Sequence, residues 1–129
     1  MKNYEICEVK TSNEKKMFIK MAHAIYDGCE HWVAPLESDI NIVFDEKKNK
    51  MFNGGEAIRF LLYDKSDNNK CVGRIAAFYN TSTSHNPSDE NLKIGGCGFF
   101  ESINSQEVAN MLFDKAKEWL LSKGLNTME

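Results

Sequence analysis

Three strand-like runs follow one another through the middle of the chain, and they limit its fold more than any other feature. The first covers residues 57–63 and the second covers residues 71–79, and the polar segment 64–70 between them predicts a turn. A third run covers residues 92–101, and its interior contains Gly95, Gly96 and Gly98. Because consecutive strands with tight or modest connections pair in an antiparallel way, the middle of the chain predicts an antiparallel sheet.

Helices are predicted before and after these runs in the sequence. Thr11 and Glu14 have the spacing of a capping box, and the apolar residues after them recur at helical spacing as far as about Tyr26. Gly28 can adopt the left-handed conformation that commonly follows a helix. A proline then suits the first position of a short second helix, predicted over about residues 35–44.

The last helix has the clearest pattern. Asn104 and Glu107 have the spacing of a capping box, and apolar residues recur at helical spacing until Lys123 and Gly124. Residues 125–129 predict the start of another strand, which would pair in parallel through a right-handed crossover. The 129 residues therefore predict a single α+β domain, with three helices and a mostly antiparallel sheet of about four strands.

Composition and spacing exclude several classes of function. The net charge of −3 argues against nucleic acid as a partner, because phosphate binding needs a concentrated basic face. No apolar run approaches the ~20 residues that span a bilayer, and the N-terminus lacks the apolar stretch of a signal peptide. We therefore expect a cytoplasmic protein without a membrane partner. The cysteines and histidines show no metal-binding spacing, so no metal site is expected.

Four local sequences accompany this order of elements. They are WVAPL at residues 32–36, VGRIAAFYN at 72–80, GFFE at 98–101 and AKEWLLSKGL at 116–125. With the order and lengths of the elements, they resemble the first half of a domain of the GNAT superfamily, the acyl-CoA-dependent N-acyltransferases. These four local sequences are also similar to those of a bacterial subfamily of much longer proteins. The resemblance implies a site for acetyl-CoA or another acyl-CoA, and a fold whose C-terminal half is missing.

The resemblance places the cofactor on the third strand and on the start of the last helix. In the family, backbone groups of the strand pair with the pantetheine arm, and N–H groups at the helix N-terminus hold the pyrophosphate. The cofactor-binding residues implied here are Phe99, Phe100, Asn104, Ser105 and Ala109. The three strand glycines leave room for pantetheine, or else they mark a bulge or tight packing against the second helix. Glu107 places a negative charge beside the phosphates, unless it acts only as a capping residue.

Three further side chains are candidates for the chemistry. Glu101 ends the third strand beside the expected cleft, and a carboxylate there could act as the base that deprotonates the attacking amine; alternatively it is an ordinary solvated carboxylate. Arg74 could bind an anionic substrate group, or it pairs with a neighbouring acid on the sheet. Cys97 could be a nucleophile only if an oriented base lay beside it, and the sequence contains no obvious one.

Two functions remain open at this stage. The first is an N-acetyltransferase-like domain, truncated or degenerate, with low or no activity alone. The second is a non-catalytic interaction domain that forms a homo-oligomer, or binds a partner chain, through an open sheet edge. Retained acyl-CoA binding would favour the first function, and a stable oligomer without acyl-CoA binding would favour the second.

Overall fold

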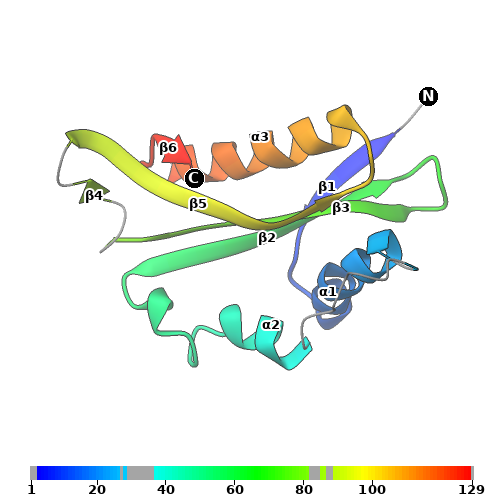
Figure 1. Ribbon diagram of the computed structural model, residues 1–129, viewed down its shortest axis with the longest axis horizontal. Coiled ribbons are helices and arrows are strands. Elements are labelled where there is room, and N and C mark those ends of the chain that lie inside the picture. Colours follow the sequence, from blue (N-terminus) through cyan, green and yellow to red (C-terminus); the bar gives the residue numbers. More distant parts are fainter. Residues whose placement is uncertain (1–2, 27, 29–36, 82–84, 87–88, 129) are drawn as a thin grey trace.

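Helices cover both faces of one mostly antiparallel sheet in the computed structural model, which describes residues 3–26, 28, 37–81, 85–86 and 89–128 (Figure 1). The strands are β1 (Tyr4–Glu8), β2 (Gly55–Asp64), β3 (Lys70–Asn80), β4 (His85–Asn86), β5 (Asp89–Ser102) and β6 (Thr127–Met128). The helices are α1 (Ser12–Tyr26), α2 (Glu37–Val43), the 3-10 helix η1 (Lys50–Phe52) and α3 (Gln106–Ser122). This arrangement confirms the α+β class.

The sheet follows the order β1-β2-β3-β5-β4, and β6 pairs with β5. Neighbouring strands are antiparallel except β5 and β6, whose parallel pairing joins Ile94 to Thr127 and Gly95 to Met128. The predicted hairpin, the third strand and the parallel strand after the last helix are therefore confirmed. The sheet has six strands, more than the four or so expected: β6 is the strand predicted to start at residues 125–129, whereas the two-residue strand β4 was not predicted.

The first helix begins and ends as its sequence predicts. The amide of Glu14 donates to Thr11 Oγ1 at 3.1 Å, and Glu14 Oε1 accepts from the amide of Thr11 at 2.8 Å. This reciprocal pair is the expected capping box. After Tyr26, Gly28 has a φ of 82°, which is the left-handed conformation expected after a helix.

Helix α3 lies on the opposite face of the sheet from α1 and α2 (Figure 1). Its buried residues Leu112 and Ala116 join a cluster with β2 and β3 that forms the larger core. Gly73 allows the close approach, because a Cβ added there would meet Leu112 Cδ1 at 2.6 Å. Most of the buried apolar surface therefore lies between α3 and the sheet.

Two boundaries differ from the sequence expectation. The N-cap of α3 is Ser105, whose Oγ accepts from the amide of Val108 at 3.3 Å, so the box expected between Asn104 and Glu107 is wrong by one residue. Asn104 is exposed and precedes the cap. The third strand begins at Asp89, three residues before the predicted run at 92–101, and the short strand β4 precedes it. The start predicted for the second helix, residues 35–36, lies outside the described residues.

No helix within the described part of the chain is long and apolar enough to cross a membrane.

Candidate functional site

Strand β5 contains a bulge near its C-terminal end. Between the pairs Gly98–Ala76 and Glu101–Arg74, β5 has two residues and β3 has one. The first of the two, Phe99, has a φ of 55°, an uncommon conformation for a bulky residue. The extra residue of a bulge leaves backbone groups outside the ladder, and strain of this kind is concentrated at functional sites.

The two residues of the bulge lie on opposite sides of the sheet. Phe99 packs beside Phe18 and Phe44 on the α1 and α2 side, with its ring 5.1 Å from that of Phe44. Phe100 stacks on Phe113 of α3 at 4.5 Å. The bulge therefore presents one aromatic side chain to each face, and a site on either face would reach the same backbone.

Arg74 holds the bulge from the neighbouring strand. Its Nε donates to the carbonyl oxygen of Phe99 at 2.9 Å, and its Nη1 donates to the carbonyl oxygen of Phe18 in α1. The side chain is 5% exposed and its guanidinium lies 4.9 Å from the Phe18 ring centre. Burial lowers the pKa of Arg74, and the nearby Glu101 opposes that shift. Arg74 thus binds two backbone carbonyls inside the fold. This differs from both expected roles, which were to bind an anionic substrate group or to pair with a neighbouring acid.

Glu101 follows the bulge and lies on the α1 side. The hydroxyl of Tyr26, in the last turn of α1, donates to Glu101 Oε2 at 2.8 Å. Among the described residues, none donates a hydrogen bond to the other carboxylate oxygen, Oε1. A half-buried carboxylate, oriented by a phenol and with one oxygen available, is able to accept a proton from a bound amine.

A cavity lies between the end of α1 and the start of α3. It has a volume of about 630 Å³ and is lined by Ile25, Phe100, Ser102, Ile103, Asn104, Ser105, Gln106 and Ala109. Four of the five residues predicted to bind the cofactor therefore meet in one place, and the fifth, Phe99, lies on the other side of β5. The first turn of α3 leaves the amides of Gln106 and Glu107 without an intrahelical acceptor. The Glu107 side chain is exposed.

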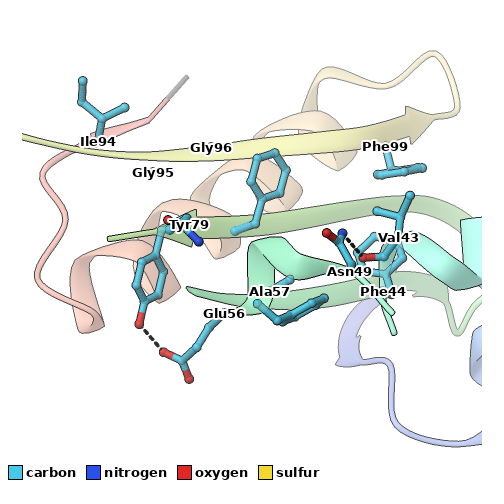
Figure 2. A pocket seen from close by; sticks show the side chains of 13 residues that line it. Val43, Phe44, Asn49, Glu56, Ala57, Tyr79, Ile94, Gly95, Gly96 and Phe99 are labelled. Carbon is cyan, nitrogen blue, oxygen red and sulfur yellow. Dashed lines mark hydrogen bonds between the residues drawn. The ribbon is translucent and has the colours of Figure 1, made fainter. Parts of the chain in front are cut away.

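A second cavity, named here the apolar groove, lies on the opposite face of the sheet from α3. Its floor includes Ala57, Phe78 and Gly96, and its wall includes Val43, Phe44 and Phe99. Figure 2 shows that Phe99, Val43 and Phe44 lie at one end of the groove and that Glu56 and Tyr79 lie at the other. Its volume is about 540 Å³, within the range of roughly 300–1,000 Å³ that is usual for small-molecule sites.

The strand glycines pack against side chains of this chain. A Cβ on Gly95 would meet Leu120 Cδ2 at 2.5 Å, and one on Gly96 would meet the Phe78 ring at 2.6 Å. Gly98 lies under the same ring, with a contact at 3.3 Å. The glycines are therefore tightly packed, but against Leu120 and Phe78 and not, as was expected, against the second helix. The bulge begins one residue later, at Phe99, and no glycine accompanies it.

Cys97 is a poor candidate for a nucleophile. It packs against the core cluster beneath α3, and burial raises the pKa of its thiol. A raised pKa decreases the thiolate fraction, which is the reactive form.

The groove and the Tyr26 contact were not predicted, because both join segments far apart in the sequence. The alternating pattern that places Phe78 beside Ala57 on one face of the hairpin is the signal that could have revealed the groove floor.

Comparison with known sequences gives one informative relative. No family model matches the chain. A bacterial ceramide synthase from Caulobacter vibrioides is 29% identical over 119 residues, which is 92% of this chain and 30% of that protein. The chain thus spans less than a third of the length of the curated relative that it matches.

Comparison of structures shows the fold of the GNAT acetyltransferases. A predicted acetyltransferase from Clostridium acetobutylicum, solved with acetyl-CoA, superposes with a TM-score of 0.64 at 13% identity, over 100% of this chain and 79% of that one. Glucosamine-6-phosphate N-acetyltransferase from Arabidopsis thaliana gives 0.62 at 9% identity, over 98% and 80%. AAC(6')-Iy, solved in complex with the bisubstrate analogue CoA-S-monomethyl-acetylneamine, gives 0.62 at 10% identity, over 98% and 78%. The fold expected from the local sequences is therefore confirmed.

Proposed function

We propose that this chain is the acyl-CoA-binding part of an N-acyltransferase and has little transferase activity by itself. The observation that carries the proposal is the bulge in β5, which lies between the cavity at the start of α3 and the apolar groove. A donor bound in the cavity and an acceptor bound in the groove would meet there. The alignment with a ceramide synthase supports transfer to an amine, because a ceramide is an amide of a long-chain amino alcohol.

The chemistry of the cavity fits an acyl-CoA in part. The amides of Gln106 and Glu107 and the positive end of the α3 dipole provide donors for a pyrophosphate. Asn104 and Ser105 add polar side chains, and Phe100 and Ala109 add apolar surface. None of the eight lining residues is basic, and Glu107 adds a negative charge to the same turn. We therefore expect weak binding, which is one reason to propose low activity for the chain alone.

Glu101 is proposed as the base of the reaction. The nitrogen of a neutral amine attacks the thioester carbon, the C–N bond forms, and the C–S bond breaks to release the CoA thiolate. The carboxylate of Glu101 accepts the proton that the amine nitrogen loses, while Tyr26 fixes its orientation through the hydrogen bond at 2.8 Å. Arg74 acts on the site indirectly, because it holds the carbonyl of Phe99 in the bulge.

Titration of the chain with acetyl-CoA and with CoA, followed by amide NMR and calorimetry, tests the proposal. We expect saturable binding, with the largest shifts at the amides of residues 102–109. Removing the negative charge with Glu107→Gln should tighten binding by about fivefold, since like charges in one turn repel by roughly 1 kcal/mol. Folded protein that shows no saturable binding of either ligand would contradict the proposal.

Glu118→Gln is the matched control for this charge change. Glu118 is an exposed acid on the same helix, about 16 Å further along at ~1.5 Å per residue. This distance exceeds the Debye length of ~8 Å at physiological ionic strength. The control should therefore leave the affinity for acetyl-CoA unchanged, and an equal gain from both variants would mean that the ligand responds only to net charge.

A second function is supported by the pairing of β6. Within the described residues, β6 pairs with β5 only at Ile94 and Gly95, and no other strand adds to that side of β5 towards the bulge. Such an edge can add a strand from a second copy or a partner chain. Light scattering distinguishes the two functions: a concentration-dependent oligomer that does not bind acetyl-CoA would favour an interaction domain.

A further inference from the structure

We propose that the apolar groove binds the alkyl tail of a long-chain primary amine, which would be the acyl acceptor. This inference rests on the proposed function and names the class of its second substrate. Three observations carry it: the exposed apolar floor of the groove, its length along β5, and the carboxylate that lies beyond its Phe99 end.

The floor of the groove exposes an unusual amount of apolar surface. The ring of Phe78 is 41% exposed, although it lies over Gly96 and Gly98 in the middle of the sheet. Ala57 is the register partner of Phe78 on β2, and its small side chain leaves open space beside the ring. Large exposed apolar side chains that gather in a hollow mark binding sites more often than ordinary surface.

The groove is elongated along β5. It extends from Gly95 at one end to Phe99 at the other, which is about 13 Å at ~3.3 Å per residue. With C–C bonds of ~1.5 Å, an extended alkyl chain of roughly ten carbons covers that length. An elongated, apolar hollow of this size suits an unbranched chain better than a compact polar acceptor.

The charges favour an amine over an acid as the head group. Glu56 is the only charged residue among the described residues that line the groove, and its carboxylate points to the α3 face, where it accepts hydrogen bonds from Tyr79 and Lys123. Beyond the Phe99 end of the groove lies Glu101. Arg59 stacks on Phe44 at 4.3 Å but lines a separate hollow. An amine at the Glu101 end, neutral or protonated, can donate a hydrogen bond to this carboxylate, whereas the ionised carboxylate of a fatty acid has no hydrogen to donate there.

This orientation is also the productive one. With the amine beside Glu101, the nitrogen lies at the bulge end of β5, next to the cavity proposed for the acyl-CoA. The tail then extends away from the thioester, past Phe99 and over Phe78 towards Ile94. The reverse orientation would place the amine at the Ile94 end, where the Glu56 carboxylate points to the α3 face and already accepts from Tyr79 and Lys123.

Dodecylamine, butylamine and dodecanoate are the probes that test the inference on the full chain. We expect dodecylamine to shift the amides of residues 57, 78 and 96, and to bind at least about tenfold more tightly than butylamine, because the additional methylenes leave water. Dodecanoate should bind more weakly than dodecylamine. Equal affinity for the long and short amines, or tighter binding of dodecanoate, would overturn the inference.

Two variants localise the binding. Ala57→Phe fills the floor and should weaken dodecylamine binding by about tenfold or more, whereas Ile42→Phe adds an aromatic ring at an exposed position that does not line the groove and should have no effect. Phe78→Ala removes the floor without adding bulk, and it should also weaken binding. Circular dichroism establishes that each variant is folded. Wild-type affinity in both groove variants would overturn the inference.

The outcomes separate this inference from the proposed function. Binding of acetyl-CoA at residues 102–109, without any binding of dodecylamine, would overturn the inference alone. Dodecanoyl-CoA provides the opposite test: if its acyl chain, and no amine, shifts residues 57 and 78, the groove holds the donor chain and the inference is wrong. Loss of acetyl-CoA binding, with the amine response intact, would overturn the proposed function instead.

Discussion

The two faces of the sheet differ in what they bury. On the α3 face, a continuous cluster of buried, mostly aliphatic residues joins the helix to β2 and β3, and glycines allow the helix to approach closely. On the α1 and α2 face, the buried cluster is smaller, two arginines stack on aromatic rings, and Phe78 remains exposed. The α3 face therefore contributes most of the stability, and the other face keeps the polar groups and open surface that a site requires.

The strongest test of this difference compares one truncation on each face. Leu112→Ala removes a side chain that is 0% exposed beneath α3, so it should decrease the free energy of unfolding by about 2 to 5 kcal/mol. Phe78→Ala removes a larger side chain from the groove, but because 41% of it is already exposed, we expect a loss of only about 1 kcal/mol. Urea unfolding of both variants measures the contrast. Equal losses would show that the groove face is part of the stabilising core.

The two arginines on the groove face should also differ from each other. Arg74→Met leaves the carbonyls of Phe99 and Phe18 without their donor, so we expect a loss of about 2 to 3 kcal/mol. Arg59→Met is the matched control, because Arg59 stacks on Phe18 as well but its buried Nη1 has no hydrogen-bond partner among the described residues. Removing an unsatisfied donor should cost little. A loss of similar size in both variants would mean that stacking, and not carbonyl binding, explains Arg74.

The sequence predicts correctly the features that depend on residues close together in the chain. The hairpin, the capping box of α1 and the parallel strand after α3 each follow from residues a few positions apart, and the structure contains all three. The bulge was expected at a glycine, if anywhere, because glycine adopts a positive φ most easily. It begins at Phe99 because Arg74, 25 residues earlier, binds the carbonyl of that residue. No local pattern encodes such a contact.

The candidate site could be predicted only in part for the same reason. The resemblance placed Phe100, Asn104, Ser105 and Ala109 near the start of α3, and these residues do line one cavity. It also singled out Glu101, but the partner Tyr26 lies 75 residues away. The groove needs α2, η1, β2, β3 and β5 together. Its location is a property of the tertiary packing, although the alternation that exposes Phe78 is already present in the sequence.

The free energy of unfolding should decrease at high pH because of a thiol on the groove face. Burial raises the pKa of the Cys71 thiol from its usual 9.0 to about 11, and that of Tyr63, its neighbour across β2 and β3, to about 12. Below pH 9.0 the thiol is neutral in the folded and unfolded states; between 9.0 and about 11 only the unfolded state ionises, so stability decreases and then levels off. For Cys71 we expect a decrease of about 1 to 2 kcal/mol, after allowing for its partial exposure.

Urea unfolding on both sides of this window, with Cys71→Val as the control, measures the effect. The variant retains an apolar side chain but has no thiol to ionise, so its stability should decrease less between pH 9.0 and about 11 than that of the parent chain. If the two chains lose the same stability, Cys71 does not contribute, and Tyr63 or another group is the cause.

The smallest effects should come from the helix caps, one on each face. Thr11→Ala removes the hydroxyl that accepts from Glu14 at the start of α1, and Ser105→Ala removes the one that accepts from Val108 at the start of α3. Each should cost about 1 kcal/mol of stability. Only Ser105 lines the proposed acyl-CoA cavity, so only Ser105→Ala should also weaken acetyl-CoA binding, by a few fold. Because the two caps are chemically alike, equal losses of stability with unequal losses of affinity would separate a structural role from a binding role. Equal affinities would instead place the cofactor away from this turn, so that the acyl-CoA site beside the β5 bulge would not include the start of α3.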